Sequence, residues 1–259
     1  MTQHTSTATA STARHHTCDP ADRVTKSLLG YGVIAGPCYV VVSLAQALTR
    51  PGFDLSRHEW SLLANGERGW MQVANLVVTG LMVIAFAVGL RRALATGTGA
   101  RWAPRLVAVY GVSLVAAGLL RADPALGFPA GTPAGPGPVS WHGAAHFVAG
   151  GIGFSCLAVA CFVLAHRYSA QRYSAQRYSA QRYSAQRRRG WARFSWLTGV
   201  VFLAGFAMVA SGAGGPVANL AFTAAVILIW VWITAVAADR YGRVSRPVTA
   251  GIAAQTTPR

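Results

Sequence analysis

The residues best suited to chemistry are His142 and His146, four positions apart near the start of an apolar segment. On a helix this spacing places both imidazoles on one face, where they could bind the same metal ion. Asp123, in the polar stretch that precedes the segment, could supply a third, carboxylate ligand. Zinc held by these three groups would keep one coordination position for water and lower the pKa of that water for hydrolysis.

A second interpretation of the histidine pair stays open. No glutamate accompanies the histidines in a His-Glu-x-x-His arrangement, so the sequence shows no general base for a metal-bound water. Histidines that make hydrogen bonds between packed helices would have the same spacing. The pair therefore predicts either a metal site together with Asp123 or a packing contact at the start of a helix.

Other polar side chains gather near the starts of apolar segments and in two long connections on the same side of the predicted membrane. They are Asp54, His58, Gln72, Asn75 and Asn219. The interiors of the apolar segments contain essentially no Asp, Glu, Lys or Arg, although ion-coupled carriers need such groups near the midplane. The sequence therefore predicts a polar, ligand-binding cluster at one membrane face and argues against a pump or a coupled transporter.

The segments that position these residues are long enough to cross a bilayer. The 259 residues are 53% hydrophobic and 12% charged, too little charge for the surface of a soluble domain. Continuous apolar runs without alternation predict helices, because backbone amides in lipid must bond within their own segment. We therefore expect an all-α, polytopic transmembrane helix bundle of six spans, at about 28–48, 71–90, 104–120, 143–165, 194–210 and 217–238.

Basic residues fall almost entirely on one side of the predicted membrane. Of the 23 Lys and Arg residues, all but Arg50, Arg57, Arg68 and Arg121 lie on that side. By the positive-inside rule, both termini and the basic connections face the cytoplasm of a cell (plasma or inner) membrane. The net charge of +16 then reflects topology, so we expect anionic lipid head groups as partners of the cytoplasmic loops, and no nucleic acid.

Composition divides the chain into three parts. Residues 1–26 and 241–259 are polar and predict disordered cytoplasmic tails on either side of a transmembrane domain at 27–240. Within that domain, residues 167–190 predict a basic, low-complexity cytoplasmic loop in which Arg-Tyr-Ser-Ala-Gln is repeated in tandem. A five-residue period turns about 140° per copy on a helix, so the copies share no common face. An expanded basic linker that lies on anionic lipid is the interpretation we favour.

The spans also repeat weakly in pairs. Asn75, His146 and Asn219 each follow an alanine near the start of an even-numbered span, and Gly and Ala recur in the odd-numbered spans. This pattern predicts three repeated helical hairpins. Small residues that favour helix packing would recur in the same way without a common origin.

Several motifs occur in order along the chain. They are Gly52-Phe53-Asp54, Arg57-His58-Glu59, Gly69-Trp70-x-Gln72-x-x-Asn75, Asp123-Pro124-x-x-Gly127-x-Pro129 and His142-Gly143-x-x-His146. Together they resemble the domain-of-unknown-function 998 family of bacterial membrane proteins, over about residues 27 to 240. The resemblance implies a multi-span bacterial inner-membrane protein and brings no activity and no functional residues with it. The Arg-Tyr-Ser-Ala-Gln repeat is not part of the family's pattern.

Three functions are open at this point. The leading interpretation is an integral membrane protein that binds a lipid or small polar ligand at the polar cluster, or scaffolds a partner. The first alternative is a metal-dependent membrane hydrolase that uses Asp123, His142 and His146. The second alternative is a facilitator-type transporter, which would need a continuous polar path between the helices.

Overall fold

The structure, a computed structural model, describes residues 19–175, 182–212 and 215–244. Within these residues lie six α-helices and one short 3₁₀ helix, η1. All six α-helices are long and apolar enough to cross a membrane, which confirms the predicted all-α bundle of six spans and makes the chain a multi-pass membrane protein. The helices are α1 Pro20–Thr49, α2 Gly69–Leu94, α3 Trp102–Leu119, α4 Trp141–Ala175, α5 Arg182–Ala210 and α6 Pro216–Val244, with η1 at Trp60–Ala64.

Helix α1 begins earlier than the end of the predicted tail at residue 26. The Asp19 side chain accepts a hydrogen bond from the backbone N of Ala21, and Pro20 occupies the first helical position. Both are favourable at a helix start, because the first amides of a helix have no partner within it. Residues 1–18 of the predicted tail lie outside the described residues.

The basic segment 167–190 is helical wherever the structure describes it. Helix α4 continues to Ala175 and α5 starts at Arg182. The repeat is rich in Arg, Ala and Gln, which are strong helix formers, so the helices extend beyond their apolar parts. Residues 176–181 lie outside the described residues, as do residues 245–259 of the predicted C-terminal tail.

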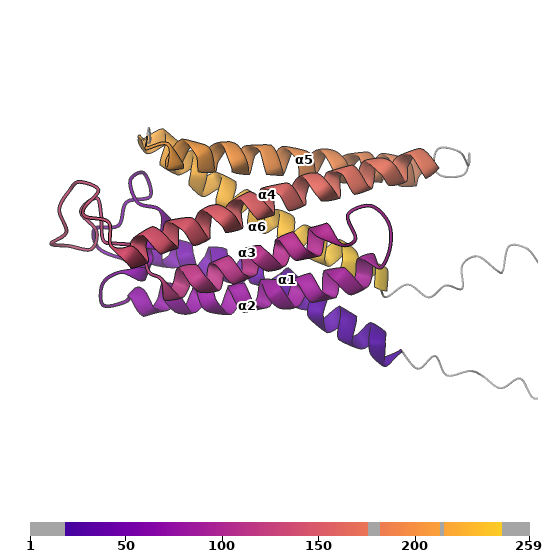
Figure 1. The fold of residues 1–259 in the computed structure, drawn as a ribbon, viewed down its shortest axis with the longest axis horizontal. Helices are drawn as coiled ribbons and strands as arrows, with labels where there is room; N and C mark the ends of the chain where they lie inside the picture. The colour runs from indigo at the N-terminus through magenta and orange to yellow at the C-terminus, as the bar shows by residue number, and fades with distance from the viewer. Residues whose placement is uncertain (1–18, 176–181, 213–214, 245–259) are drawn as a thin grey trace, which may run out of the picture.

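The six α-helices form a closed ring in the order of the sequence. Each helix packs against the next one, and α6 packs against α1 (Figure 1). Connections 50–68 and 120–140 lie together at one end of the bundle, which we call the capped end. The α2–α3 connection, the start of α1, the end of α6 and the projecting parts of α4 and α5 lie at the other, the arginine end.

Aromatic side chains fill the middle of the ring. Tyr39 of α1 stacks on Trp230 of α6 with ring centroids 4.6 Å apart, and Tyr110 of α3 contacts the same indole. Phe154 of α4 packs edge-on against Phe202 of α5. All of these rings except Phe154 are buried. The centre of the bundle is therefore packed with ring systems from five helices.

Close helix packing depends on glycine at two crossings. A Cβ added to Gly36 of α1 would overlap Thr234 Oγ1 and lie 2.9 Å from the backbone O of Trp230, both in α6. At the α2–α3 crossing, a Cβ on Gly80 or Gly111 would lie 2.8 Å from the other glycine's carbonyl oxygen. Small residues at such positions are typical of helix pairs in membranes, where packing replaces the hydrophobic effect as the driving force.

Candidate functional site

A cluster of polar side chains lies buried between α1 and α2 in the capped half of the bundle. We call Ser43, Gln46, Gln72 and Asn75 the polar core; each is at most 7% exposed. Gln46 Nε2 donates to Gln72 Oε1 at 2.9 Å, and Gln72 Nε2 donates to Ser43 Oγ at 3.2 Å. Asn75 Nδ2 also donates to Ser43 Oγ, at 3.1 Å. The four side chains therefore form one hydrogen-bonded network with no charged member.

Some buried polar atoms in the capped half and in the middle of the bundle have no partner within the described residues. Two are acceptors, Gln46 Oε1 and Asn219 Oδ1, and two are donors, the indole nitrogens of Trp60 and Trp230. The ring of Tyr39 contacts both indoles, with centroids 5.8 Å from Trp60 and 4.6 Å from Trp230. A buried amide or indole group without a partner costs about 1–3 kcal/mol, so these atoms favour the presence of a further polar group.

His58 joins the two connections of the capped end. Its Nδ1 accepts from the backbone N of Asp54 at 2.9 Å, so its Nε2 carries the proton and donates to the backbone O of Leu126 at 3.0 Å. The side chain is 2% exposed and packs between the rings of Phe53 and Phe128. His58 is therefore a neutral structural bridge, and it lies in the cap, outside the polar core.

Arg50 and Asn65 add further contacts between the same connections. Arg50 donates to the backbone oxygens of Leu63 and Asn65, and its guanidinium lies 4.9 Å from the Phe128 ring centroid. Asn65 Nδ2 donates to the backbone O of Ala122 at 3.0 Å. Partial burial lowers the pKa of Arg50, with Arg68 as a second cause, while the group stays a cation. Connections 50–68 and 120–140 thus fold together as one cap over the bundle.

Asp54 has a local role in this cap. Its Oδ1 accepts from the N and Oγ of Ser56, at 2.8 and 2.7 Å, as in a turn closed by an aspartate. These hydrogen bonds hold the pKa of Asp54 below its usual range. Neither Asp54 nor His58 is thus available to the polar core.

Asn219 connects the last helix to the first connection. Its Nδ2 donates to the backbone O of Leu55 at 2.9 Å, and its side chain is 5% exposed. The amide oxygen of the same side chain is one of the unpartnered acceptors. Asn219 therefore joins α6 to the cap and has one buried polar atom without a partner within the described residues.

Asp123 fixes the start of α4. Its two oxygens accept from Ser140 Oγ at 2.6 Å and Ser140 N at 2.7 Å, and Ser140 Oγ in turn accepts from Gly143 N at 3.1 Å. The hydrogen bonds from Ser140 lower the pKa of Asp123. The carboxylate thus holds the residue that caps the helix, a role common for short polar side chains at this position.

Both histidines of the predicted metal site donate to the end of α3. His142 Nδ1 lies 3.1 Å from the backbone O of Arg121, and His146 Nδ1 lies 3.0 and 2.9 Å from those of Ala117 and Leu120. In the neutral rings the lone pair is then on Nε2, an arrangement that ligating histidines also use. In the described parts of the chain, however, no three His, Cys, Asp or Glu side chains are placed to hold a metal ion. Zinc binding by Asp123, His142 and His146 stays a prediction.

The structure distributes the eight predicted site residues over three places. Gln72 and Asn75 belong to the polar core, and Asn219 of α6 donates to Leu55 in the cap. The cap contains the second group, Asp54 and His58, and the α3–α4 corner contains the third, Asp123, His142 and His146. Two of the eight thus belong to the polar core.

Two of the three residues that suggest repeated hairpins have matching contacts. Asn75 Nδ2 donates to the backbone O of Tyr39 in the preceding helix α1, and His146 donates to that of Ala117 in the preceding helix α3. Asn219 differs, because its Nδ2 donates to the backbone O of Leu55 in the cap and not to the preceding helix α5. The repeated hairpins stay a prediction, with a shared interhelical hydrogen bond in two of them.

Two groups of residues were missed at the sequence level. The first contains Ser43, Gln46 and Trp60; Ser43 and Gln46 are three residues apart in a long apolar span, a spacing that marks one polar helix face. The second surrounds Asp239, which accepts from Arg187 at 3.0 Å and from Arg243 at 2.8 Å. The spacing of Asp239 and Arg243, i and i+4 on one helix, is the signal that could have revealed it.

Charged side chains hold segments together at two places in the arginine end. The side chain of Asp239 is 1% exposed and also lies 3.7 Å from Arg240, whose guanidinium donates to Tyr168 Oη at 2.9 Å. Arg167 of α4 donates to the backbone oxygens of Thr96 and Thr98, at 2.9 and 2.8 Å, and so fastens the α2–α3 connection. Charged side chains therefore join the segments of this end.

Comparison with known proteins gives one match. The family described as "Protein of unknown function (DUF998)" matches residues 33–239, a range that contains every predicted site residue and the polar core. No curated protein and no solved structure matches the chain.

Proposed function

The chain belongs to the DUF998 family of proteins of unknown function, and from that premise we propose that it binds a small, uncharged polar molecule in the capped half of its bundle. The site would lie between α1, α2, α6 and η1, below the cap formed by connections 50–68 and 120–140. Binding, rather than catalysis or transport, is the function that the arrangement supports best.

The observation that carries this proposal is the set of buried polar atoms without a partner within the described residues, one of them on Gln46 of the polar core. Gln46 Oε1 and Asn219 Oδ1 could accept hydrogen bonds, and the indoles of Trp60 and Trp230 could donate them. A molecule with both donors and acceptors would satisfy these atoms in surroundings where each bond is strong. Because the polar core contains no charged side chain, an uncharged ligand fits it better than an ion.

The alternatives have less support. A facilitator needs a polar path across the bilayer, whereas the rings of Tyr39, Tyr110 and Trp230 fill the bundle below the polar core. The hydrolase would need Asp123, His142 and His146 around one metal ion, whereas no three His, Cys, Asp or Glu side chains among the described residues are placed to hold one.

For localisation we propose a plasma or inner membrane with the arginine end in the cytoplasm. The positive-inside rule supports this orientation, since all but four of the 23 basic residues lie at that end or in segments continuous with it. Reporter fusions after residue 259 and within connection 120–140 test it. We expect cytoplasmic reporter activity from the first and none from the second; the reverse result overturns the orientation.

Extraction of the protein in native membrane nanodiscs, followed by mass spectrometry of the bound small molecules, tests the ligand site. We expect the wild-type protein to retain a polar molecule at near one copy per chain. The variant Gln46→Met should lose it, because the change keeps the side-chain volume and removes one free acceptor together with a donor.

Thr198→Val is the matched control for this experiment. Thr198 on α5 is equally buried and its hydroxyl has no hydrogen bond within the described residues, so the variant also removes an unpartnered polar atom, but far from the polar core in the sequence. We expect Thr198→Val to retain the molecule. If wild type and Gln46→Met carry the same small molecules in the same amounts, the proposed site is wrong.

A further inference from the structure

Three arginines from two helices meet at one carboxylate at the arginine end. Arg187 Nη2 of α5 donates to Asp239 Oδ1 of α6 at 3.0 Å, and Arg243 Nη2 donates to the same oxygen at 3.1 Å. Arg243 Nε donates to Asp239 Oδ2 at 2.8 Å, and Arg240 Nε lies 3.7 Å from that oxygen. Because Arg187 and Arg243 share one oxygen, their guanidiniums are held close enough for a single small oxyanion to contact both.

The cluster has more positive charge than the chain neutralises. Arg187, Arg240 and Arg243 contribute three positive charges and Asp239 one negative charge, which leaves two positive charges. The chain has seven Asp and Glu residues, all within the described ranges, and among them Asp239 is the only one that pairs with these arginines. Further neutralisation must therefore come from a group other than an aspartate or glutamate of this chain.

Two of the guanidiniums can be reached from outside the bundle. The side chains of Arg187 and Arg243 are 48% and 43% exposed, whereas those of Arg240 and Asp239 are 8% and 1% exposed. Of the five N–H donors of a guanidinium, Arg187 uses one on Asp239 and Arg243 uses two. The buried Nε of Arg240 has no hydrogen-bond partner within the described residues. A buried carboxylate thus fixes two half-exposed guanidiniums that keep donors for an oxyanion.

The depth of the cluster indicates which oxyanion is at hand. The apolar segment of the last span ends at about residue 238, and α6 ends at Val244, so Asp239 and Arg243 lie in the last turns of the helix. This is the level of the lipid head groups rather than of the acyl chains. Phosphate is the anionic group that phospholipids present at this level, and arginine binds it through paired hydrogen bonds.

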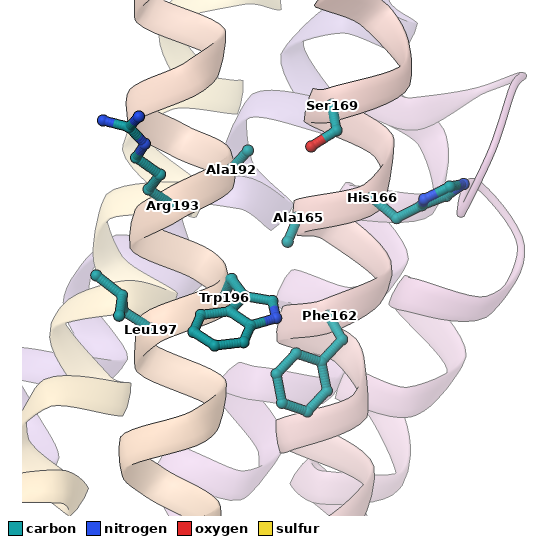
Figure 2. A pocket seen from close by; sticks show the side chains of 8 residues that line it. All are labelled: Phe162, Ala165, His166, Ser169, Ala192, Arg193, Trp196 and Leu197. Carbon is teal, nitrogen blue, oxygen red and sulfur yellow. The ribbon is translucent and has the colours of Figure 1, made fainter.

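Other exposed basic groups of this end are arranged differently. Figure 2 shows Arg193 of α5 and His166 of α4 pointing away from the groove between their helices, on opposite sides, so the two groups do not converge. Arg105 of α3 lies over the ring of Trp102 in its own helix, 5.6 Å from the centroid. The cluster at Asp239 differs because one anchor holds its guanidiniums together.

We propose that Arg187 and Arg243 bind one phosphate group on the exposed side of the Asp239 cluster. The phosphate neutralises part of the excess positive charge, and Asp239 holds the two guanidiniums in position for it. The depth of the cluster favours the head group of an anionic phospholipid as the source. Free phosphate has the same chemistry, and the experiment below separates the two. The site does not involve the polar core.

Native mass spectrometry of the full-length protein in detergent and phosphate-free buffer tests the site. Phosphatidylglycerol is titrated, and the fraction of protein with one bound lipid gives an apparent Kd; a parallel titration with phosphatidylcholine measures unspecific binding. We expect one saturable phosphatidylglycerol site. In a second arm, inorganic phosphate is compared with sodium chloride at equal ionic strength, and the melting temperature is measured. A rise with phosphate alone identifies the free anion as a source, and saturable lipid binding without that rise identifies the phospholipid.

Matched variants separate this site from general attraction to anions. Arg187→Gln should weaken binding of the effective ligand roughly tenfold, the loss expected for one charge-assisted hydrogen bond, and Arg243→Gln should weaken it by a similar factor. Arg187→Gln leaves the hydrogen bonds between Arg243 and Asp239 in place, so we expect the variant to fold. Arg105→Gln removes the same charge from an exposed position on α3 and should change binding by less than about twofold.

Either of two results overturns the proposal. The first is that wild type shows neither saturable phosphatidylglycerol binding nor a rise in melting temperature with phosphate. The second is an equal loss in Arg105→Gln and Arg187→Gln, which would show that only the overall charge matters. Circular dichroism of each variant identifies a folding defect, and the comparison between Arg187→Gln and Arg105→Gln holds even if Arg243→Gln fails to fold.

Discussion

The two ends of the bundle join their segments by different chemistry. At the capped end, the neutral side chains of His58, Asn65 and Asn219 donate to backbone oxygens of connections 50–68 and 120–140, and the Arg50 cation adds a contact with the Phe128 ring. At the arginine end, Asp239 forms ion pairs with Arg187 and Arg243, and Arg167 donates to a backbone oxygen of the α2–α3 connection.

This difference has a physical consequence. A neutral hydrogen bond is worth about 1 kcal/mol net, so a polar ligand can replace or join such bonds at little cost. A buried charge cluster is more costly to disturb, because each member left alone must be rehydrated or neutralised. The capped end is therefore suited to hold an exchangeable molecule, and the arginine end is suited to hold the helices in place.

The largest expected effect comes from Asp239→Asn at the arginine end. The variant leaves Arg240, which is 8% exposed, without its carboxylate. We expect the free energy of unfolding to fall by about 3 kcal/mol, near the low end for an uncompensated buried charge, since Arg187 and Arg243 can turn to water. Thermal unfolding of the purified protein in a mild detergent measures this loss.

Asp22→Asn is the control for that prediction. Asp22 lies exposed in the first turn of α1, so the same chemical change should alter stability by less than about 0.5 kcal/mol. Equal melting temperatures for Asp239→Asn and the wild type would show that the charge cluster does not hold the arginine end together.

A smaller effect is expected from Gly143→Ala at the capped end. A Cβ at this position would overlap Asp123 Oδ2, and the carboxylate is held in place by Ser140. We expect a loss of about 2 kcal/mol from overpacking, together with faster hydrogen exchange at the start of α4. Gly150→Ala on the same helix is the control, because nothing lies within 4 Å of its added Cβ. Similar exchange in the two variants would contradict the role given to Asp123.

The smallest effect is a change of stability with pH through Asp123. Its folded-state pKa lies below the unfolded value of about 3.9, so its contribution is fully present above that value and is lost as the pH falls through the folded pKa. We expect the difference in melting temperature between wild type and Asp123→Asn to shrink below about pH 4.

Glu59 also makes stability depend on pH, so the prediction concerns the difference in melting temperature between wild type and Asp123→Asn. Burial raises the pKa of Glu59, so its contribution has the opposite sign: it is present below the unfolded value and is lost as the pH rises through the folded one. Subtraction of the Asp123→Asn curve removes that background. A difference that stays constant from pH 3 to pH 7 would show that Ser140 does not stabilise the ionised carboxylate.

Much of the fold follows from the sequence alone. The six spans and their order need only hydropathy and length, because the bilayer admits no other way to satisfy the backbone of such segments. The helix ends were less predictable, since α4 and α5 continue into the basic repeat through helix propensity rather than apolarity.

The candidate site was only partly predictable for a different reason. Position near a span end groups Gln72 and His58, but Gln72 lies on a buried face of α2 and joins the polar core, whereas His58 lies in connection 50–68 and joins the cap. The partners of Gln72 are Ser43 and Gln46 in another helix, and the rotation of that helix is set by packing at Gly36. Sequence periodicity carries no information on such pairing between helices.

The hydrogen bond from Asn219 to Leu55 joins positions 164 residues apart, on the last helix and in the first connection. During synthesis the ribosome must deliver all six spans to the membrane before this contact can form. The first connection can meet connection 120–140 once the first three helices are present, but its bond to Asn219 forms only after the final helix has been inserted. Closure of the capped end marks the completion of assembly.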